Sequence, residues 1–195
     1  MEIILASYNA HKAREIGEIM SPVRVKSLAE FGVELDFDAI EDGATYEENA
    51  IKKARAASAR VKGIVAADDS GLEVESLGGR PGLLSARYGG AEIPDADRCR
   101  LLLDEMKDMP DGRRGARFVC VVAALFPDGR EAIFTGECRG VIIREMRGGR
   151  GFGYDPVMFL PGRGLTVAEL SPEEKNRISH RAIAFKALRD SLLYG

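Results

Sequence analysis

Two short apolar runs, each followed at once by polar residues, constrain this chain more than any other feature. Ile3-Ile4-Leu5-Ala6 and Ile64-Val65-Ala66-Ala67 are short, bounded and apolar, which is typical of buried strands. The polar residues that follow are Ser7, Asn9 and Lys12 after the first run, and Asp68-Asp69-Ser70-Gly71 after the second. A chain built this way places hydrogen-bonding and charged groups where buried strands end.

Helical patterns separate these strands. Ile16, Ile19 and Met20 are spaced for one face of a helix that Asn9 can cap. Thr45-Tyr46-Glu47-Glu48 and Ser171-Pro172-Glu173-Glu174 have capping-box spacing, so we expect helices to begin at both places. We also expect Asp95 to cap a helix, and Ser179 to cap the last helix, whose predicted apolar face includes Ile183 and Leu188.

Further strands are predicted in the second half of the chain. The ranges are 72–74, 118–126, 131–135 and 141–144, with the turn Pro127-Asp128-Gly129-Arg130 joining the second to the third. Strands and helices alternate early and strands cluster late. This order predicts an α/β fold, in which helices flank a mixed β-sheet.

Composition excludes several classes of protein. The 195 residues suffice for one sizeable core, in one domain or two lobes. A formal net charge of −3 argues against a general nucleic-acid binder. Cys99, Cys120 and Cys138 form no C-x-x-C pair, so we expect neither a disulfide framework nor a zinc site, and a reducing cytoplasm fits best. No apolar run approaches the roughly 18 residues of a membrane span, and no signal-peptide pattern precedes the first strand.

The first polar group suggests an anion site. A helix N-terminus carries unpaired N–H groups and a partial positive charge, and a strand that leads into it is a common phosphate site. Lys12 adds a cation where the helix dipole disfavours one, which a bound phosphate would reverse. The alternative is that Asn9 is only a cap and Lys12 only solvated. Neither standard phosphate-loop signature is present.

The second polar group suggests a metal. Adjacent carboxylates on a strand point to opposite sides, and a hard divalent cation is one partner for Asp68 or Asp69. The alternative is a turn in which these side chains bind local backbone. Glu41 could contribute to the same metal and Lys53 to the same phosphates, although either residue is also typical of a solvated surface.

The last candidate groups lie near the C-terminal end. Phe152 could stack on a base and Asp155 could accept hydrogen bonds from a purine edge. The alternative is that Phe152 and Tyr154 only pack the glycine-rich loop and Asp155 only begins the turn before Pro156. Lys175 and Arg181 could donate to a keto oxygen, and His180 is either a structural donor or part of that site.

The order of the motifs resembles the inosine triphosphate pyrophosphatase family. The motifs, in order, are S-x-N-x-x-K, E-E-N-A-x-x-K-A, A-D-D-S-G-L, L-G-G-x-P-G-x-x-S-A-R-Y, G-F-G-Y-D-P and E-E-K-x-x-I-S-H-R. They run from about Leu5 to Leu188. The resemblance implies one elongated, two-lobed domain over residues 1–195 with a central active-site cleft, forming a homodimer.

The resemblance also implies an activity. The expected enzyme is a cytoplasmic nucleoside triphosphate pyrophosphatase that hydrolyses ITP, dITP and XTP to the monophosphate and pyrophosphate. It implies magnesium as cofactor, with manganese as the alternative, and neither nucleic acid nor membrane as a partner.

Roles carry over residue by residue. Asp69 is the implied catalytic residue, accepting the proton of the attacking water, and also a metal ligand together with Glu41. Phe152 is expected to stack on the base. The implied substrate-binding residues are Ser7, Asn9, Lys12, Lys53, Ser70, Phe152, Gly153, Tyr154, Asp155, Lys175, His180 and Arg181.

Three positions depart from the family pattern. Ser7 stands where threonine is frequent, Tyr8 where glycine is common, and Ile40 where many relatives have an acidic residue. The Tyr8 side chain either crowds the phosphate loop or points away from it. Two other functions stay open beside the first: a less selective nucleotide hydrolase, and a nucleotide- or RNA-binding module without catalysis.

Overall fold

A mixed seven-stranded sheet forms the framework of the protein. The computed structural model describes all 195 residues. The strands are β1 (Glu2–Leu5), β2 (Arg24–Ser27), β3 (Ile64–Val74), β4 (Gly115–Leu125), β5 (Glu131–Ile142), β6 (Met158–Leu160) and β7 (Leu165–Thr166). Their order is β2-β1-β3-β4-β5-β6-β7. β1 pairs in parallel with β2 and β3, whereas β6 pairs antiparallel with β5 and β7. The predicted α/β class with a mixed sheet is confirmed.

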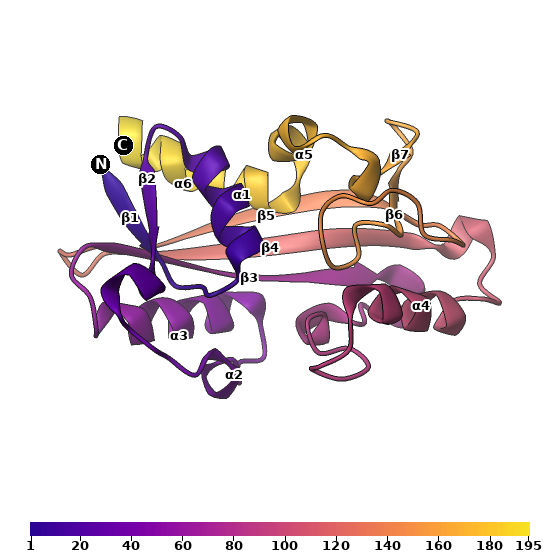
Figure 1. The fold of residues 1–195 in the computed structure, drawn as a ribbon, viewed down its shortest axis with the longest axis horizontal. Helices are drawn as coiled ribbons and strands as arrows, with labels where there is room; N and C mark the ends of the chain where they lie inside the picture. Colours follow the sequence, from indigo (N-terminus) through magenta and orange to yellow (C-terminus); the bar gives the residue numbers. More distant parts are fainter. The chain divides into compact units, whose positions relative to one another are not determined.

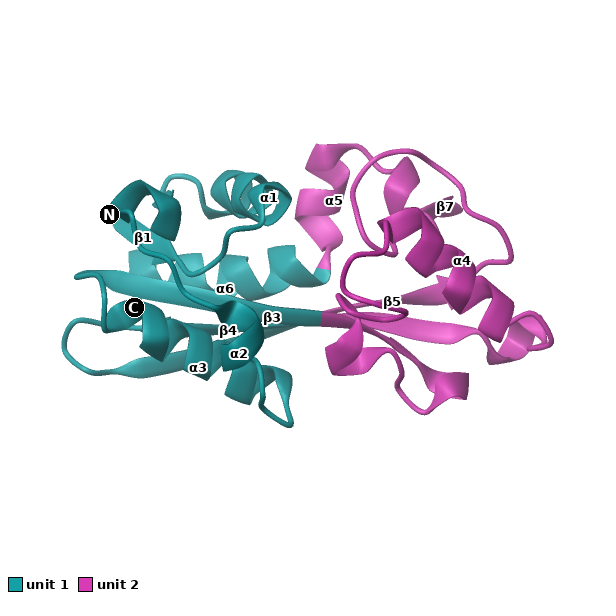
Figure 2. Cartoon of the chain, turned by 60° about the horizontal axis from the view of Figure 1, so that its bottom comes forward, with its two compact units in different colours: residues 1–70, 120–136, 180–195 teal, residues 71–119, 137–179 magenta.

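Six helices accompany the sheet. They are α1 (Ala10–Met20), α2 (Phe37–Ile40), α3 (Tyr46–Ser58), α4 (Asp95–Glu105), α5 (Pro172–Ile178) and α6 (His180–Tyr194). No helix is long and apolar enough to cross a membrane. The chain divides into two compact units, coloured separately in Figure 2. Unit 1 comprises residues 1–70, 120–136 and 180–195, and unit 2 comprises residues 71–119 and 137–179.

In unit 1, helices cover both faces of the sheet. Ile3 and Leu5 of β1 pack with α1 and α6, while Ile4 and Ala6 pack with α3. Figure 1 shows α1 and α6 on one face and α3 on the other. A parallel strand buried on both sides needs a continuous apolar run, which is why β1 carries one. The predicted face of α1 is confirmed, because Ile16, Ile19 and Met20 are its buried residues.

Unit 2 has its own core. Leu72 and Val74 at the end of β3 pack with Cys99 and Leu102 of α4 and with Ile142 of β5. The residues after β5 add further apolar side chains to this core, namely Tyr154 and Val157 of the loop and Met158 at the start of β6. The candidate base-binding loop is therefore anchored in a packed interior.

Two strand predictions are wrong. β3 does not stop at Asp68-Asp69-Ser70-Gly71 but continues through it to Val74, so these residues form no turn. The ranges 131–135 and 141–144 belong to one continuous strand, β5, which ends at Ile142. In both cases a polar or glycine-containing stretch lies inside a strand because neighbouring elements contact it.

Helix capping follows the sequence in part. Ser171 forms the predicted capping box with Glu174, and Pro172 occupies the first turn. Thr45 accepts from Glu48 N, whereas the Glu48 carboxylate accepts from Ala44 N.

Two predictions about the other helices are wrong. Asp95 caps nothing, since Pro94 occupies the N-cap position of α4. The Asp95 carboxylate accepts instead from Gly153 N at 2.6 Å. Ile183, which was predicted on the buried face of α6, is 42% exposed. Phe185 of the same helix is buried instead.

Candidate functional site

Ser7, Asn9 and Lys12 lie at the N-terminus of α1. Asn9 caps the helix, its Oδ1 accepting from Lys12 N at 3.0 Å, and Asn9 N donates to Ser7 Oγ at 3.2 Å. The Lys12 ammonium donates to Asp68 Oδ2 at 3.0 Å. A protein carboxylate therefore offsets the unfavourable placement of this cation, so Lys12 does not by itself require a bound phosphate.

Asp68 is a buried anion surrounded by cations. Its Oδ2 atom accepts hydrogen bonds from Lys12 Nζ and, at 2.9 Å, from Ser70 Oγ. The same oxygen lies 3.7 Å from Arg181 Nη2. Burial alone would raise the pKa of Asp68, but the charges of Lys12, Arg181 and Lys53 outweigh burial and hold that pKa well below its ordinary value. Asp68 is therefore ionised at neutral pH. Its Oδ1 atom is buried and accepts no hydrogen bond from the protein.

Asp69 faces different groups. Asn49 Nδ2 of α3 donates to its Oδ2 at 3.0 Å, and Ser70 N donates to its Oδ1 at 3.1 Å. Burial raises the pKa of Asp69 and Glu41 adds to the rise, and together they outweigh the opposing effects of Lys53 and Asn49. A buried carboxylate with a raised pKa is suited to accepting a proton.

The Lys53 ammonium lies close to oxygen atoms of three acidic residues. It donates to Glu41 Oε1 and to Asp68 O, both at 2.6 Å, and lies 3.7 Å from Asp69 Oδ1. Burial would lower the pKa of Lys53, but the charges of Asp69, Asp68 and Glu41 raise it overall, so the ammonium stays charged. Lys53 is 4% exposed, which excludes the alternative of a solvated surface lysine.

These groups fit a divalent metal ion that takes some of its ligands from outside the protein. The carboxylates of Glu41 and Asp69 converge on one ammonium, and Asp68 Oδ1 is a buried oxygen with no partner. No cluster of three or more His, Cys, Asp or Glu side chains is assembled as a metal cage. Magnesium commonly binds one or two carboxylates and takes its other ligands from water and substrate phosphates.

In unit 2, the loop from Phe152 to Asp155 is fixed by buried polar contacts. Asp155 Oδ2 accepts from Lys175 Nζ at 2.7 Å and from Phe152 N at 3.0 Å. The Lys175 ammonium lies 4.7 Å from the centre of the Phe152 ring. Gly151 has φ +77°, and a Cβ there would collide with the Asp155 carboxylate. The structure thus brings three predicted residues, Phe152, Asp155 and Lys175, together.

Tyr154 is part of the core of unit 2. Its side chain is buried and its hydroxyl donates to Ser85 O at 2.9 Å, while burial raises its pKa well above the ordinary value. Gly153 N donates to Asp95, and Gly153 O accepts from Cys99 Sγ at 3.3 Å. Tyr154 and Gly153 therefore anchor the loop, and Phe152 is its remaining aromatic side chain.

His180 and Arg181 begin α6 and belong to unit 1. Arg181 is 2% exposed, and its Nη1 atom donates to Glu15 Oε2 of α1 at 3.0 Å. Its other terminal nitrogen faces Asp68 at 3.7 Å. The structure thus places Arg181 with the acidic residues of unit 1, while Lys175 lies with Phe152 and Asp155 in unit 2.

The sequence interpretation gave no role to Asn49 or Glu15. Asn49 accepts from Gly43 N at 2.8 Å while it donates to Asp69, so it ties the segment after α2 to the acidic centre. Asparagine has a low propensity for helix interiors, so its presence within the predicted helix was the one sequence feature that could have pointed to a role for Asn49. Glu15 offered no comparable signal, because its partner Arg181 is remote in sequence.

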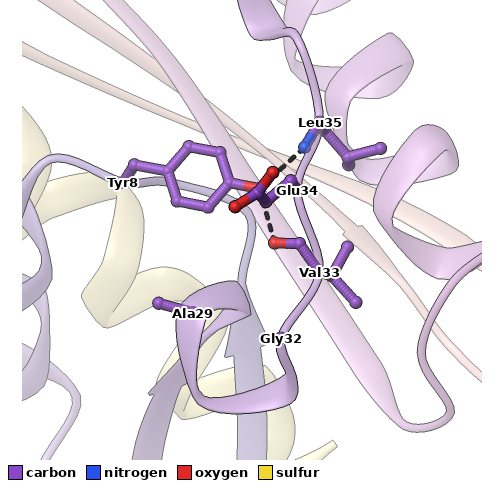
Figure 3. Close-up of a pocket in the computed structure, with 6 residues that line it drawn as sticks. All are labelled: Tyr8, Ala29, Gly32, Val33, Glu34 and Leu35. Atoms are coloured by element: carbon purple, nitrogen blue, oxygen red, sulfur yellow. Dashed lines mark hydrogen bonds between the residues drawn. The ribbon is translucent and has the colours of Figure 1, made fainter.

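The Tyr8 side chain reaches the segment that contains Val33 and Leu35. Its hydroxyl donates to Val33 O and accepts from Leu35 N, both at 2.8 Å (Figure 3).

Comparison with known proteins gives one consistent result. Residues 3–191 match the model of the Ham1 family. The chain is 49% identical over 193 residues to the dITP/XTP pyrophosphatase of Geobacillus kaustophilus, covering 96% of this chain and 92% of that protein. It is 46% identical over 197 residues to the dITP/XTP pyrophosphatase of Escherichia coli K12, covering 100% and 99%.

A solved structure shares the fold. The HAM1 protein from Coxiella burnetii aligns with a TM-score of 0.88 at 38% identity, over 100% of both chains. The motifs that resemble inosine triphosphate pyrophosphatases, the mixed sheet and these full-length matches agree, and the chain belongs to the Ham1 family.

Proposed function

We propose that this protein hydrolyses non-standard purine nucleoside triphosphates, namely ITP, dITP and XTP, to the nucleoside monophosphate and pyrophosphate. The names of the relatives, dITP/XTP pyrophosphatases, support this activity. The observation that carries it is the acidic centre of unit 1. There a buried carboxylate with a raised pKa, Asp69, lies beside the ammonium of Lys53.

Asp69 is the proposed proton acceptor. Asn49 and Ser70 N hold its two oxygens, so the carboxylate has a fixed orientation. It takes a proton from the water that attacks the triphosphate, which makes that water a better nucleophile. Hydrolysis of a phosphoanhydride needs positioning and neutralisation of charge more than covalent help. The three cysteines are buried, and burial raises the pKa of each thiol, so none is an activated nucleophile.

Magnesium is the proposed cofactor, with manganese as the alternative. Glu41 and Asp69 would hold it, since both carboxylates lie beside the Lys53 ammonium. When bound, the ion supplies positive charge that polarises the phosphate oxygens. Lysine side chains of the protein would supply the remaining positive charge. Lys12 and Lys53 would bind phosphate oxygens together with Ser7, Asn9 and Ser70.

Base recognition is proposed for Phe152, Lys175 and their neighbours. The Phe152 ring would stack on the purine, and Lys175 would donate to the 6-keto oxygen, with Gly153, Tyr154 and Asp155 holding the loop. His180 and Arg181 are further proposed donors. Adenine carries an amino group where hypoxanthine carries this keto oxygen, so donors there disfavour ATP by about 1–3 kcal/mol or more.

The remaining assignments follow from the proposed activity. We propose that residues 1–195 act as one catalytic domain, that two copies form a homodimer, and that the enzyme works in the cytoplasm on free nucleotides. Reduced cysteines are stable in that compartment, which agrees with three buried free thiols. We propose no nucleic-acid or membrane partner.

Product analysis tests the proposed function. Purified protein is incubated with magnesium and, separately, ITP, XTP, GTP and ATP, and pyrophosphate and orthophosphate are quantified. We expect pyrophosphate and monophosphate from ITP and XTP, with ATP nearly unchanged. Orthophosphate as the first product would overturn cleavage between the α and β phosphates. Equal turnover of all four nucleotides would favour a less selective hydrolase, and binding of ITP without any product would favour a binding module.

A further inference from the structure

Tyr8 connects two segments that carry functional residues. It lies between Ser7 and Asn9, and its side chain reaches the segment between β2 and α3. Figure 3 shows the hydroxyl between Val33 O and Leu35 N, acting as donor to one and acceptor from the other. A single hydroxyl thus satisfies backbone groups of this segment that have no strand to pair with.

The contact continues from Tyr8 to α2. The Tyr8 and Phe37 rings lie with centroids 5.2 Å apart and tilted by 39°. Phe37 is the first residue of α2, and Phe37 O accepts from Glu41 N at 2.9 Å. The carboxylate of Glu41 then meets Lys53 in the acidic centre. An unbroken series of contacts therefore runs from the Tyr8 side chain to the proposed metal ligand Glu41.

The two ends of this series differ in secondary structure. Tyr8 follows β1, which is hydrogen-bonded to β2 and β3, and precedes the capped N-terminus of α1. The segment with Val33 and Leu35 has no strand, and α2 has only four residues. Its residues Gly32 to Leu35 border a cavity of about 520 Å³. The side chains of Val33, Leu35 and Phe37 pack against the core between β1 and α3, and the Tyr8 hydroxyl adds the two hydrogen bonds that fix the backbone of this segment.

We infer that Tyr8 is a positioning residue for Glu41, and that its hydroxyl sets how tightly the protein holds a divalent cation. This inference rests on the proposed role of Glu41 as a metal ligand. Residues that orient metal ligands affect affinity without touching the ion. The Tyr8 hydroxyl acts through the backbone of Val33 and Leu35, which leads directly into α2, so it needs no contact with nucleotide or metal.

The decisive variant is Tyr8→Phe, which keeps the ring and removes the hydroxyl. Binding of Mn²⁺ to nucleotide-free protein is measured by calorimetry, together with the Mg²⁺ concentration for half-maximal release of pyrophosphate from ITP. We expect the Kd for Mn²⁺ and the half-maximal Mg²⁺ concentration each to rise about three- to tenfold. Loss of a direct hydrogen-bond partner of a metal ligand typically costs about 10–100-fold in affinity, and Tyr8 acts less directly. The KM for ITP at saturating Mg²⁺ should stay near that of the unmodified protein.

Matched controls separate a specific effect from a general one. Tyr194→Phe makes the same chemical change at a residue that is 84% exposed, and it should alter neither quantity. Glu41→Gln should weaken Mn²⁺ binding directly, and Tyr8→Phe added to Glu41→Gln should have no further effect. Should Tyr8→Phe fail to fold, Phe37→Leu removes the ring contact between Tyr8 and α2 and is expected to weaken Mn²⁺ binding.

Two failures can be told apart. If Glu41→Gln weakens Mn²⁺ binding but Tyr8→Phe does not, the positioning role of Tyr8 is wrong and the role of Glu41 stands. If Glu41→Gln leaves Mn²⁺ binding unchanged, Glu41 is no metal ligand, and the metal assignment fails together with this inference. A lower melting temperature of Tyr8→Phe with unchanged Mn²⁺ binding would show a purely structural contact and would also overturn it.

Discussion

Asp68 and Asp69 are consecutive residues of β3, yet their carboxylates contact helices on opposite faces of the sheet. Asp68 pairs with Lys12 of α1 and lies near Arg181 of α6, whereas Asp69 accepts from Asn49 of α3. Side chains alternate along a strand, so an adjacent pair is divided in this way. The division gives the two acids different environments, with the pKa of Asp68 lowered and that of Asp69 raised.

Asp69→Asn should abolish most of the activity without unfolding the protein. The amide keeps the shape of the side chain but cannot accept the proton, so we expect turnover of ITP to fall about 10²–10⁴-fold. Asp42→Asn is the control, since Asp42 is an exposed neighbour of Glu41 that pairs with Lys52. Pyrophosphate release measures both variants, and comparable losses in the two would argue against a specific role for Asp69.

Asn49→Leu should move the acid limb of the pH–rate profile to higher pH. Asn49 donates to Asp69 and so lowers a pKa that burial has raised. Without this donor the pKa of Asp69 rises further, and a higher pH is needed to keep the base ionised. The profile of kcat/KM against pH for ITP measures the shift. An acid limb at its original place would mean that Asp69 is not the group titrating there.

Asp68→Asn should destabilise the fold in a pH-dependent way. Removing one partner of a buried ion pair costs about 3 kcal/mol or more at neutral pH. The pKa of Asp68 is lowered from the ordinary 3.8, so its stabilising contribution is complete above that pH and is lost as the pH falls below it. Urea unfolding at pH 7 and pH 3 measures the difference between variant and original protein. We expect this difference to shrink at the lower pH, and a constant difference would refute the ionic origin.

Gly136→Ala should displace the start of α6. A Cβ at residue 136 would overlap His180 O and approach Ala184 N, and backbone atoms cannot move aside cheaply. We expect a loss of about 1–3 kcal/mol in the free energy of unfolding. Gly17→Ala is the matched control, because Gly17 lies in α1 with open space around it and should gain about 0.5–1 kcal/mol. Thermal unfolding compares them, and equal effects would exclude the contact with α6 as the cause.

Local sequence patterns predicted the elements with strong apolar periodicity and missed those stabilised by distant partners. The buried face of α1 and the capping box at Ser171 follow from neighbouring residues alone. β2, Arg24–Ser27, has little apolar signal and forms because β1 pairs with it. β5 was divided around Gly136, whose missing side chain in fact admits α6.

The candidate site shows the same limit. Motif order identified the acids, the lysines and the aromatic loop, but not which charges neutralise one another. The alternative of a solvated Lys53 stayed open, because nothing local reveals that its ammonium lies between Glu41 and Asp69. Arg181 was grouped with the base-binding residues, and its contact with Glu15 follows only from the packing of α6 beside α1.

Unit 1 is assembled from three separate stretches of chain, and this order has a consequence for biosynthesis. Residues 1–70 are translated before all of unit 2, while α6 with Arg181 is translated after it. During synthesis Asp68 therefore has Lys12 available as a counter-charge but lacks Arg181 until the last helix emerges. The acidic centre is completed only after translation has passed α6, so a nascent chain shortened before that point cannot yet have the finished electrostatics of the enzyme.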